Sequence, residues 1–204
     1  KLEIKADTDH TKLIAMLNAL NDYSVPMSDI LGKYFDTENL AYWMAFQLLT
    51  GNTDTQSRNM YLYSPTNSDT FYVLDWDNDG MLMRKEYEIK QRSDGKSWEN
   101  GISNYWGNML FSRCLQTKSF RTALDKAIKD EYKYMNANRI NSMVKHYRSI
   151  TEQYVWKMPD SMYEGVTKSQ YDVIANKLHS EIEQNYKTYQ NRFNKPMPFY
   201  IGPP

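Results

Sequence analysis

The hydrophobic positions of this chain recur at helical spacing over much of its second half. Apolar residues every three to four positions predict helices at about 137–157 and 167–193, and shorter apolar stretches predict helices at about 105–116 and 119–133. We expect the apolar stripes of the two long helices to face the core. The stripes are Ile140, Met143, Val144, Tyr147, Ile150 and Tyr154 in the first, and Tyr171, Ile174, Leu178, Ile182, Tyr186 and Tyr189 in the second.

A different pattern occupies residues 40–49, which are apolar at nearly every position. Such a stretch is typical of a helix that is buried on all sides, and it is too short to cross a membrane. Asp36 suits the N-cap of this helix, and Gly51 suits the left-handed residue that ends it. The pattern therefore predicts a central core helix.

The next hydrophobic segments, 60–63 and 71–74, are rich in aromatic and β-branched residues. They are joined by Ser-Pro-Thr-Asn-Ser-Asp at 64–69, and these residue types favour turns. Two such segments around a turn predict a β-hairpin. Together with the helices, the hairpin indicates an α+β fold that is mainly helical.

Acidic and amide side chains stand where these elements end. Asp54 follows the buried helix, Asn59 precedes the first strand, and Asp75 and Asp77 end the second strand. Kinase-type phosphoryl transfer uses an Asp that orients the acceptor hydroxyl, and an Asn and a later Asp that hold the metal ions on the nucleotide phosphates. The spacing thus predicts a catalytic Asp54 and a magnesium and ATP site at Asn59 and Asp77.

The same acidic region also fits five positions of a calcium-loop pattern. These positions are Asp75, Asp77, Asp79, Gly80 and Glu86. The predicted strand before Asp75 argues against an EF-hand, which has a helix there, and Met83 offers no oxygen ligand at the ninth position. A Ca²⁺-stabilised loop and a plain solvated acidic turn remain alternatives to the magnesium site.

Composition sets broader limits. With 204 residues, of which 41% are hydrophobic, the chain can bury a core as one domain. Its 25 Lys and Arg balance 25 Asp and Glu, so no overall field attracts nucleic acid or an anionic membrane. The single cysteine, Cys114, excludes an internal disulfide framework and is expected to be a buried apolar residue. The three histidines have no metal-ligand spacing.

Three motifs surround the acidic positions: Gly-Asn-Thr-Asp at 51–54, Asn-Met-Tyr-Leu-Tyr at 59–63 and Asp-Trp-Asp-Asn-Asp at 75–79. Together with the closing Pro-Met-Pro-Phe-Tyr-Ile-Gly segment at 196–202, they resemble the CotH family of spore-coat and secreted atypical kinases. The resemblance covers most of the chain. It implies the C-terminal lobe of a kinase-like fold over residues 1–195, with the hairpin at the active site, and a Pro-rich exit linker at 196–204.

The resemblance also implies a function. A protein of this family would transfer a phosphoryl group from ATP, with Mg²⁺, to Ser or Thr of a spore-coat or cell-surface protein, as part of a multidomain extracytoplasmic protein. Asp54 would be catalytic, Asn59 and Asp77 would bind metal and nucleotide, and Asp75 and Asp79 are secondary metal candidates. Phe71 would form part of the adenine wall.

One departure from the family pattern concerns the N-terminal side. Family members carry an upstream β-rich nucleotide-binding region with a phosphate-contacting lysine, whereas this chain has no Gly-rich phosphate loop and only 8 Gly. We therefore expect the chain to lack its nucleotide-covering lobe and to be inactive by itself. A non-catalytic pseudokinase, or a calcium-stabilised surface or adhesion module, is the alternative. We expect neither a nucleic-acid partner nor a membrane span, and the sequence leaves the oligomeric state open.

Overall fold

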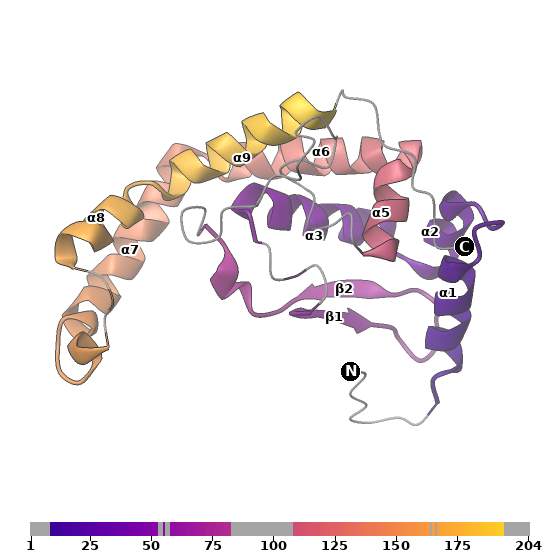
Figure 1. The fold of residues 1–204 in the computed structure, drawn as a ribbon, viewed down its shortest axis with the longest axis horizontal. Coiled ribbons are helices and arrows are strands. Elements are labelled where there is room, and N and C mark those ends of the chain that lie inside the picture. The colour runs from indigo at the N-terminus through magenta and orange to yellow at the C-terminus, as the bar shows by residue number, and fades with distance from the viewer. Residues whose placement is uncertain are drawn as a thin grey trace.

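The computed structural model describes residues 9–52, 55, 58–82, 108–163, 165 and 167–193, which form a mainly helical structure with one small antiparallel sheet (Figure 1). This confirms the predicted mainly helical α+β class, while the likeness to a kinase lobe stays a prediction. The helices are α1 (Thr11–Asn21), α2 (Met27–Tyr34), α3 (Thr37–Thr50), α5 (Met109–Gln116), α6 (Lys118–Tyr134), α7 (Ala137–Val155), α8 (Lys168–Ala175) and α9 (Leu178–Phe193). The strands are β1 (Met60–Tyr63) and β2 (Tyr72–Asp75), and short 3₁₀ helices η1 (Asn78–Gly80) and η2 (Asp160–Met162) complete the set.

Helix α3 is the centre of the core, as its sequence predicts. The Asp36 carboxylate accepts a hydrogen bond from the Asn39 N–H at 2.8 Å, and Gly51 ends the helix with a φ of 64°. Most of its apolar side chains are buried, and Trp43 stacks on Phe111 of α5 with ring centroids 5.4 Å apart. Both helix ends are therefore set by the local signals in the sequence.

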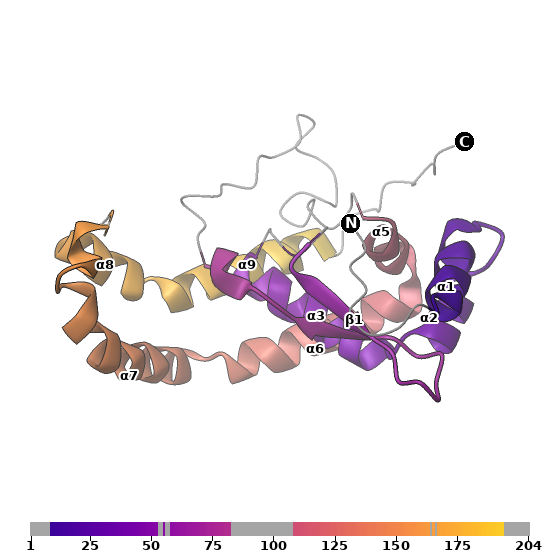
Figure 2. The same ribbon diagram turned by 90° about the horizontal axis from the view of Figure 1, so that it is seen from below.

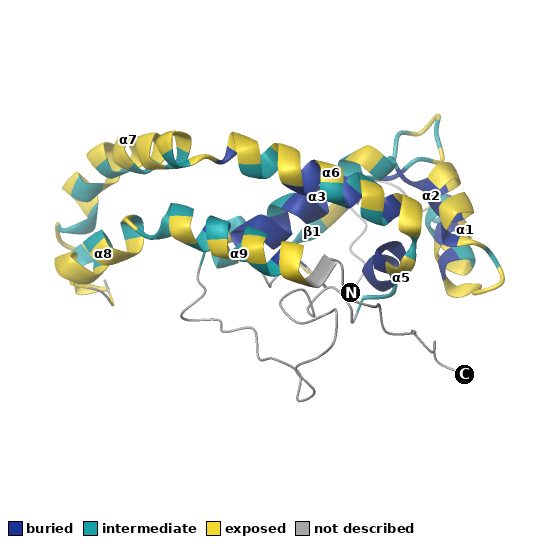
Figure 3. Cartoon of the chain, turned by 90° about the horizontal axis from the view of Figure 1, so that it is seen from above, coloured by how far each residue is buried: buried dark blue, intermediate teal, exposed yellow. Residues whose placement is uncertain are grey.

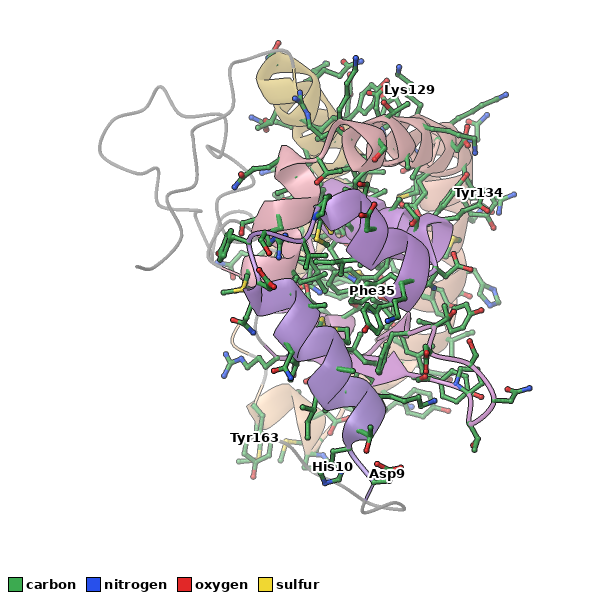
Figure 4. The ribbon with its side chains drawn as sticks, turned by 90° about the vertical axis from the view of Figure 1, so that its right-hand side faces the viewer. Asp9, His10, Phe35, Lys129, Tyr134 and Tyr163 are labelled. Atoms are coloured by element: carbon green, nitrogen blue, oxygen red, sulfur yellow. The ribbon has the colours of Figure 1, made fainter. Side chains whose placement is uncertain are left out.

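The hairpin is fastened to α3 through Asn39. The Asn39 Oδ1 accepts from the Val73 N–H at 2.7 Å, and its Nδ2 donates to the Val73 carbonyl at 3.2 Å. The predicted hairpin is confirmed, but β2 runs over 72–75 rather than 71–74. Phe71 instead forms a parallel bridge with Phe35, just before α3. Figure 4 shows Phe35 among the crowded side chains of the core.

Helices α6 and α9, which come later in the chain, pack against α3 (Figure 2). Asn185 of α9 donates from Nδ2 to the Leu49 carbonyl at 3.0 Å, and Gly51 lies so close that a Cβ atom there would come within 2.9 Å of this Nδ2. Tyr132 of α6 stacks on Tyr186 of α9 with centroids 3.8 Å apart. The core therefore joins segments that are far apart in sequence.

At the other end of the molecule, α1 and α2 are joined to α5 by a buried arginine. Arg113 donates to the carbonyls of Leu20 and Val25, the latter at 2.6 Å, and its guanidinium lies 5.0 Å from the Tyr23 ring centroid. These carbonyls belong to the end of α1 and the turn after it, where backbone acceptors lack helical partners. The sequence analysis predicts neither α1 nor α2.

The C-terminal helices differ most from the prediction. The single helix expected at 167–193 is wrong, because the chain forms α8 and α9 with a break at Asn176, a residue with weak helix preference. The expected burial of the stripe on α7 is also wrong, because α7 has no fully buried residue. Figure 3 shows α7 and α8 as exposed and half-buried ribbon at one end of the molecule, whereas much of α3 in the middle is buried. These two helices extend beyond the core, and several of their large apolar side chains are exposed.

Some expectations fall outside the described residues, namely those on Asp54, Glu86, the start of the helix at 105–116 and the linker at 196–204. Cys114 is fully buried, as expected, and burial raises the pKa of its thiol. None of the helices in the described part of the chain has both the length and the apolar character needed to cross a bilayer.

Candidate functional site

The candidate site lies at one end of the hairpin, where the register brings two polar segments together. Met60 pairs with Asp75 in the antiparallel sheet, so Asn59 precedes β1 at the same end where Trp76 and Asp77 follow β2. Antiparallel pairing therefore brings together residues that are more than a dozen positions apart in sequence. The sequence-predicted pair Asn59 and Asp77 thus shares one end of the sheet.

The backbone at this end is unusual. Asn59 and Asp77 both have a φ of 55°, in the left-handed region that residues other than glycine rarely adopt. Asn and Asp tolerate this region better than other residues, and such conformations often occur at functional sites. Asn59 is half-buried and the Asp77 residue is exposed, which leaves the Asp77 carboxylate accessible to a ligand.

A buried glutamine holds the residues after β2 in place. Gln47 of α3 is fully buried, and its Nε2 donates to the Asp75 Oδ1 at 2.8 Å and to the Asn78 Oδ1 at 3.3 Å. Asn52, just after α3, donates from Nδ2 to the same Asn78 oxygen at 3.1 Å. The loop after α3 and the loop after β2 are therefore bound to each other and to the core helix.

Sequence reasoning did not identify Gln47 or Asn78 as part of the site. A signal was present, because Gln47 is the polar side chain within an otherwise apolar stretch. A polar group in a helix that is buried all round needs a hydrogen-bond partner. The partner could not be named from the sequence, since Asp75 and Asn78 come close to Gln47 through tertiary packing alone.

The carboxylate of Asp75 is partly withdrawn from water. Partial desolvation raises the pKa of Asp75, and the hydrogen bond from Gln47 opposes this rise without cancelling it. A carboxylate with a raised pKa is stabilised by a nearby cation, which favours its charged form. The electrostatics of Asp75 are therefore compatible with a bound divalent ion beside it.

A second carboxyl group, which the sequence analysis missed, lies on the core side. Glu131 of α6 follows the buried positions Phe120, Leu124 and Ile128 at helical spacing, and burial together with the charge of Asp75 raises its pKa to about 8. Its Oε2 is buried and has no hydrogen-bond partner among the described residues. Burial therefore favours the neutral form of the Glu131 carboxyl group.

The remaining acidic candidate, Asp79, lies exposed in η1, directly after the loop that Gln47 holds. Within the described ranges, no three His, Cys, Asp or Glu side chains gather closely enough to bind a metal ion together. A calcium loop requires six to eight oxygen ligands, whereas Mg²⁺ on a nucleotide needs one or two carboxylates and the phosphate oxygens. The donor set of Asn59 and Asp77 fits the second requirement.

Phe71 and Asp54 complete the sequence-predicted set. The structure places Phe71 in the core at the far end of β2 from Asp75, with 6% of the residue exposed and its ring 6.3 Å from that of Phe35. Packing accounts for this ring, and the described contacts lend no support to a role in adenine binding. Asp54 lies outside the described residues, two positions after the anchored Asn52.

A family model described as CotH kinase protein matches residues 1–189, which is most of the chain. A search of curated proteins finds no match.

Proposed function

Because the chain belongs to the CotH kinase family, we propose that it is the C-terminal part of an atypical protein kinase that transfers the γ-phosphoryl group of ATP to Ser or Thr hydroxyls. The acceptor would be a spore-coat or cell-surface protein, in an extracytoplasmic location. The observation that carries the proposal is the register of the hairpin. Met60 lies opposite Asp75, so Asn59 and Asp77 share one end of the sheet.

Each residue has a role in this proposal. Asn59 and Asp77 would hold Mg²⁺ through an amide and a carboxylate oxygen, and Asp75 would add negative charge beside them. When bound, the metal ion neutralises charge on the phosphates during transfer. Asp54 would orient the acceptor hydroxyl and take its proton. Gln47 and Asn52 would keep the two loops at a fixed separation, because both donate to Asn78.

The test is Mg²⁺-dependent ATP binding by the full-length protein, measured by calorimetry. Asp77→Asn removes the exposed carboxylate and should abolish Mg²⁺-dependent binding while the fold stays intact. Asp69→Asn is the matched control, since Asp69 lies in the turn at the opposite end of the hairpin from Asp77. Unchanged nucleotide affinity in folded Asp77→Asn would contradict the proposed metal site.

The calcium alternative has its own test, at Glu86. A calcium loop depends on a bidentate carboxylate at its twelfth position, which a nucleotide-bound Mg²⁺ does not need. Glu86→Gln should therefore leave the melting temperature in millimolar Ca²⁺ unchanged. If Glu86→Gln lowers the melting temperature and EDTA lowers that of the unaltered protein equally, a calcium-stabilised module is the better description.

A further inference from the structure

The α7 and α8 helices carry an apolar surface that the described core leaves uncovered. Along α7, Met143, Tyr147 and Tyr154 are 47%, 58% and 58% exposed. Amphipathic helices normally bury such a stripe against the rest of the protein. Contiguous exposed apolar surface on a soluble protein often marks a binding site for another molecule.

We call the part of the molecule formed by α7 and α8 the arm. Its apolar surface contains a groove of about 510 Å³, which we call the arm groove. One wall is α7, including Met143 and Tyr147, and the other is formed by α8 and the start of α9, including Tyr171 and Ile182. Figure 3 shows these helices running side by side beyond the core. Phe46 and Thr50 of α3 also line the groove, so the groove reaches from α7 and α8 to the core.

The inner end of the arm groove adjoins the candidate site. Thr50, Met81 and Leu82 line it there, and the Leu82 N–H donates to the Thr50 carbonyl at 2.7 Å. Thr50 ends α3 just before Asn52, and Met81 directly follows η1, which Gln47 anchors through Asn78. A polypeptide in the groove would therefore extend towards the end of the hairpin that carries Asp77.

The lining has the composition of a protein interface. Its described residues include three methionines, three tyrosines and two arginines, and no Lys, Asp or Glu. Met, Tyr and Arg are enriched at the centres of protein interfaces, and the other three types are depleted there. Methionine side chains also adapt to differently shaped apolar partners. This composition favours a polypeptide as the occupant.

The two arginines of the lining differ in their partners. Arg148 is bound to both Glu152 and Asp172. Arg139 lies over the Tyr134 ring with its guanidinium 3.7 Å from the centroid, and no carboxylate in the described part of the chain pairs with it. An occupant that brings a carboxylate to Arg139 would gain a charge-assisted hydrogen bond.

We propose that the arm groove docks a segment of the acceptor protein that has large apolar side chains and at least one Asp or Glu facing Arg139. The identification of the occupant as an acceptor rests on the proposed kinase function. A second copy of the chain is a poorer fit, because a symmetric contact would set two concave surfaces face to face and leave the groove unfilled.

The experiment selects peptides from a random library displayed on phage, with the whole chain as bait and without nucleotide or metal. We expect the enriched peptides to carry two or more large apolar residues and an Asp or Glu. Met143→Glu should weaken their binding about tenfold or more, because it places a charge in the apolar groove. Met162→Glu is the control, since Met162 is 66% exposed on the same arm and does not line the groove.

A charge exchange tests the role of Arg139. The Arg139→Glu protein should no longer bind the selected acidic peptides. It should bind altered peptides in which Lys replaces the acidic residue. Enrichment of no peptide, equal binding to Met143→Glu, or selection of basic peptides would overturn the proposal. Self-association that Met143→Glu abolishes in ultracentrifugation would also overturn it, in favour of a contact between copies.

The docking proposal and the kinase proposal can fail separately. Peptide selection needs no Mg²⁺ or ATP, so failure of the full-length protein to bind nucleotide would leave the groove as a docking site and remove the kinase role. If the protein does bind nucleotide, a selected peptide extended by a Ser-containing segment should be phosphorylated faster than one without the docking sequence. Equal rates for the two peptides would contradict the acceptor role of the groove.

Discussion

The α3 core and the α7–α8 arm are both built from helices rich in apolar residues, but the core buries these side chains and the arm leaves many of them exposed. In the core, two polar residues of α3 make internal hydrogen bonds, since Asn39 binds the backbone of β2 and Gln47 binds Asp75. On the arm, Tyr147 and Tyr154 remain largely in solvent. We therefore expect substitutions in the core to change the free energy of unfolding, and substitutions on the arm to change binding.

The largest effect should come from Arg113. Arg113→Met removes the donor to the Leu20 and Val25 carbonyls and leaves buried acceptors without partners, which should lower the free energy of unfolding by about 3 kcal/mol. Urea denaturation measures this loss. Lys118→Met on the exposed side of α6 is the control. A loss below about 1 kcal/mol would mean that the α1–α5 contact is held by apolar packing instead.

A smaller loss, about 2 kcal/mol, is expected for Gln47→Leu, because one buried donor serves both Asp75 and Asn78. Hydrogen exchange should rise in the segment after β2 and stay unchanged in α1. Gln153→Leu is the control, because Gln153 is exposed and bonds within its own helix. Unchanged exchange in Gln47→Leu would show that this segment does not depend on α3.

Glu131 should make the stability of the core depend on pH. Its pKa is raised from 4.5 to about 8 in the folded chain, so the folded chain holds this proton more tightly than the unfolded chain. Stability should therefore fall as the pH rises from about 4.5 to about 8. Glu131→Gln should remove this contribution and stabilise the protein by about 1 kcal/mol near pH 8, allowing for the partial exposure of the group.

Denaturation curves between pH 5 and pH 8 test the Glu131 effect, with exposed Glu38→Gln as the control. The slope of stability against pH should flatten in Glu131→Gln and stay the same in Glu38→Gln. An unchanged slope in Glu131→Gln would mean that Glu131 is solvated and charged at neutral pH.

The smallest effect is expected on the arm. Tyr147→Ser should change the free energy of unfolding by no more than about 0.5 kcal/mol, because the side chain is largely exposed. Leu124 of α6 is fully buried, so Leu124→Ala should instead lower the free energy of unfolding by about 3 kcal/mol. Similar losses for the two variants would show that the arm surface is covered in solution.

The sequence predicts those elements of the fold that are set by local chemistry. The limits of α3 follow from Asp36 and Gly51, and the hairpin follows from its turn. The helices α1 and α2 have no side-chain hydrogen bond at their N-caps, so they lack the signal that marks α3. The periodicity of α7 correctly indicates an amphipathic helix, but periodicity cannot say what covers the apolar face.

In the candidate site, too, the residues placed by local sequence signals can be predicted, and those placed by tertiary packing cannot. Asn59 and Asp77 are found from the sequence because they stand at strand ends, and a hairpin brings its strand ends together. Gln47 and Glu131 are not found, because their roles depend on which helices pack against which. Both are polar residues at positions where the helical pattern calls for an apolar one, and that mismatch is the signal that sequence reasoning can use.

The packing of α9 against α3 has a consequence for how the protein is made. The hydrogen bond from Asn185 to Leu49 joins positions 136 residues apart, and Gly51 is fitted to the same side chain. Such non-local contacts slow folding, because a long loop must close before they form. During synthesis the apolar surface of α3 would emerge long before α9, one of the two helices that cover it. The nascent chain would therefore expose the side of α3 that faces α9 until the ribosome has translated nearly the whole of this sequence.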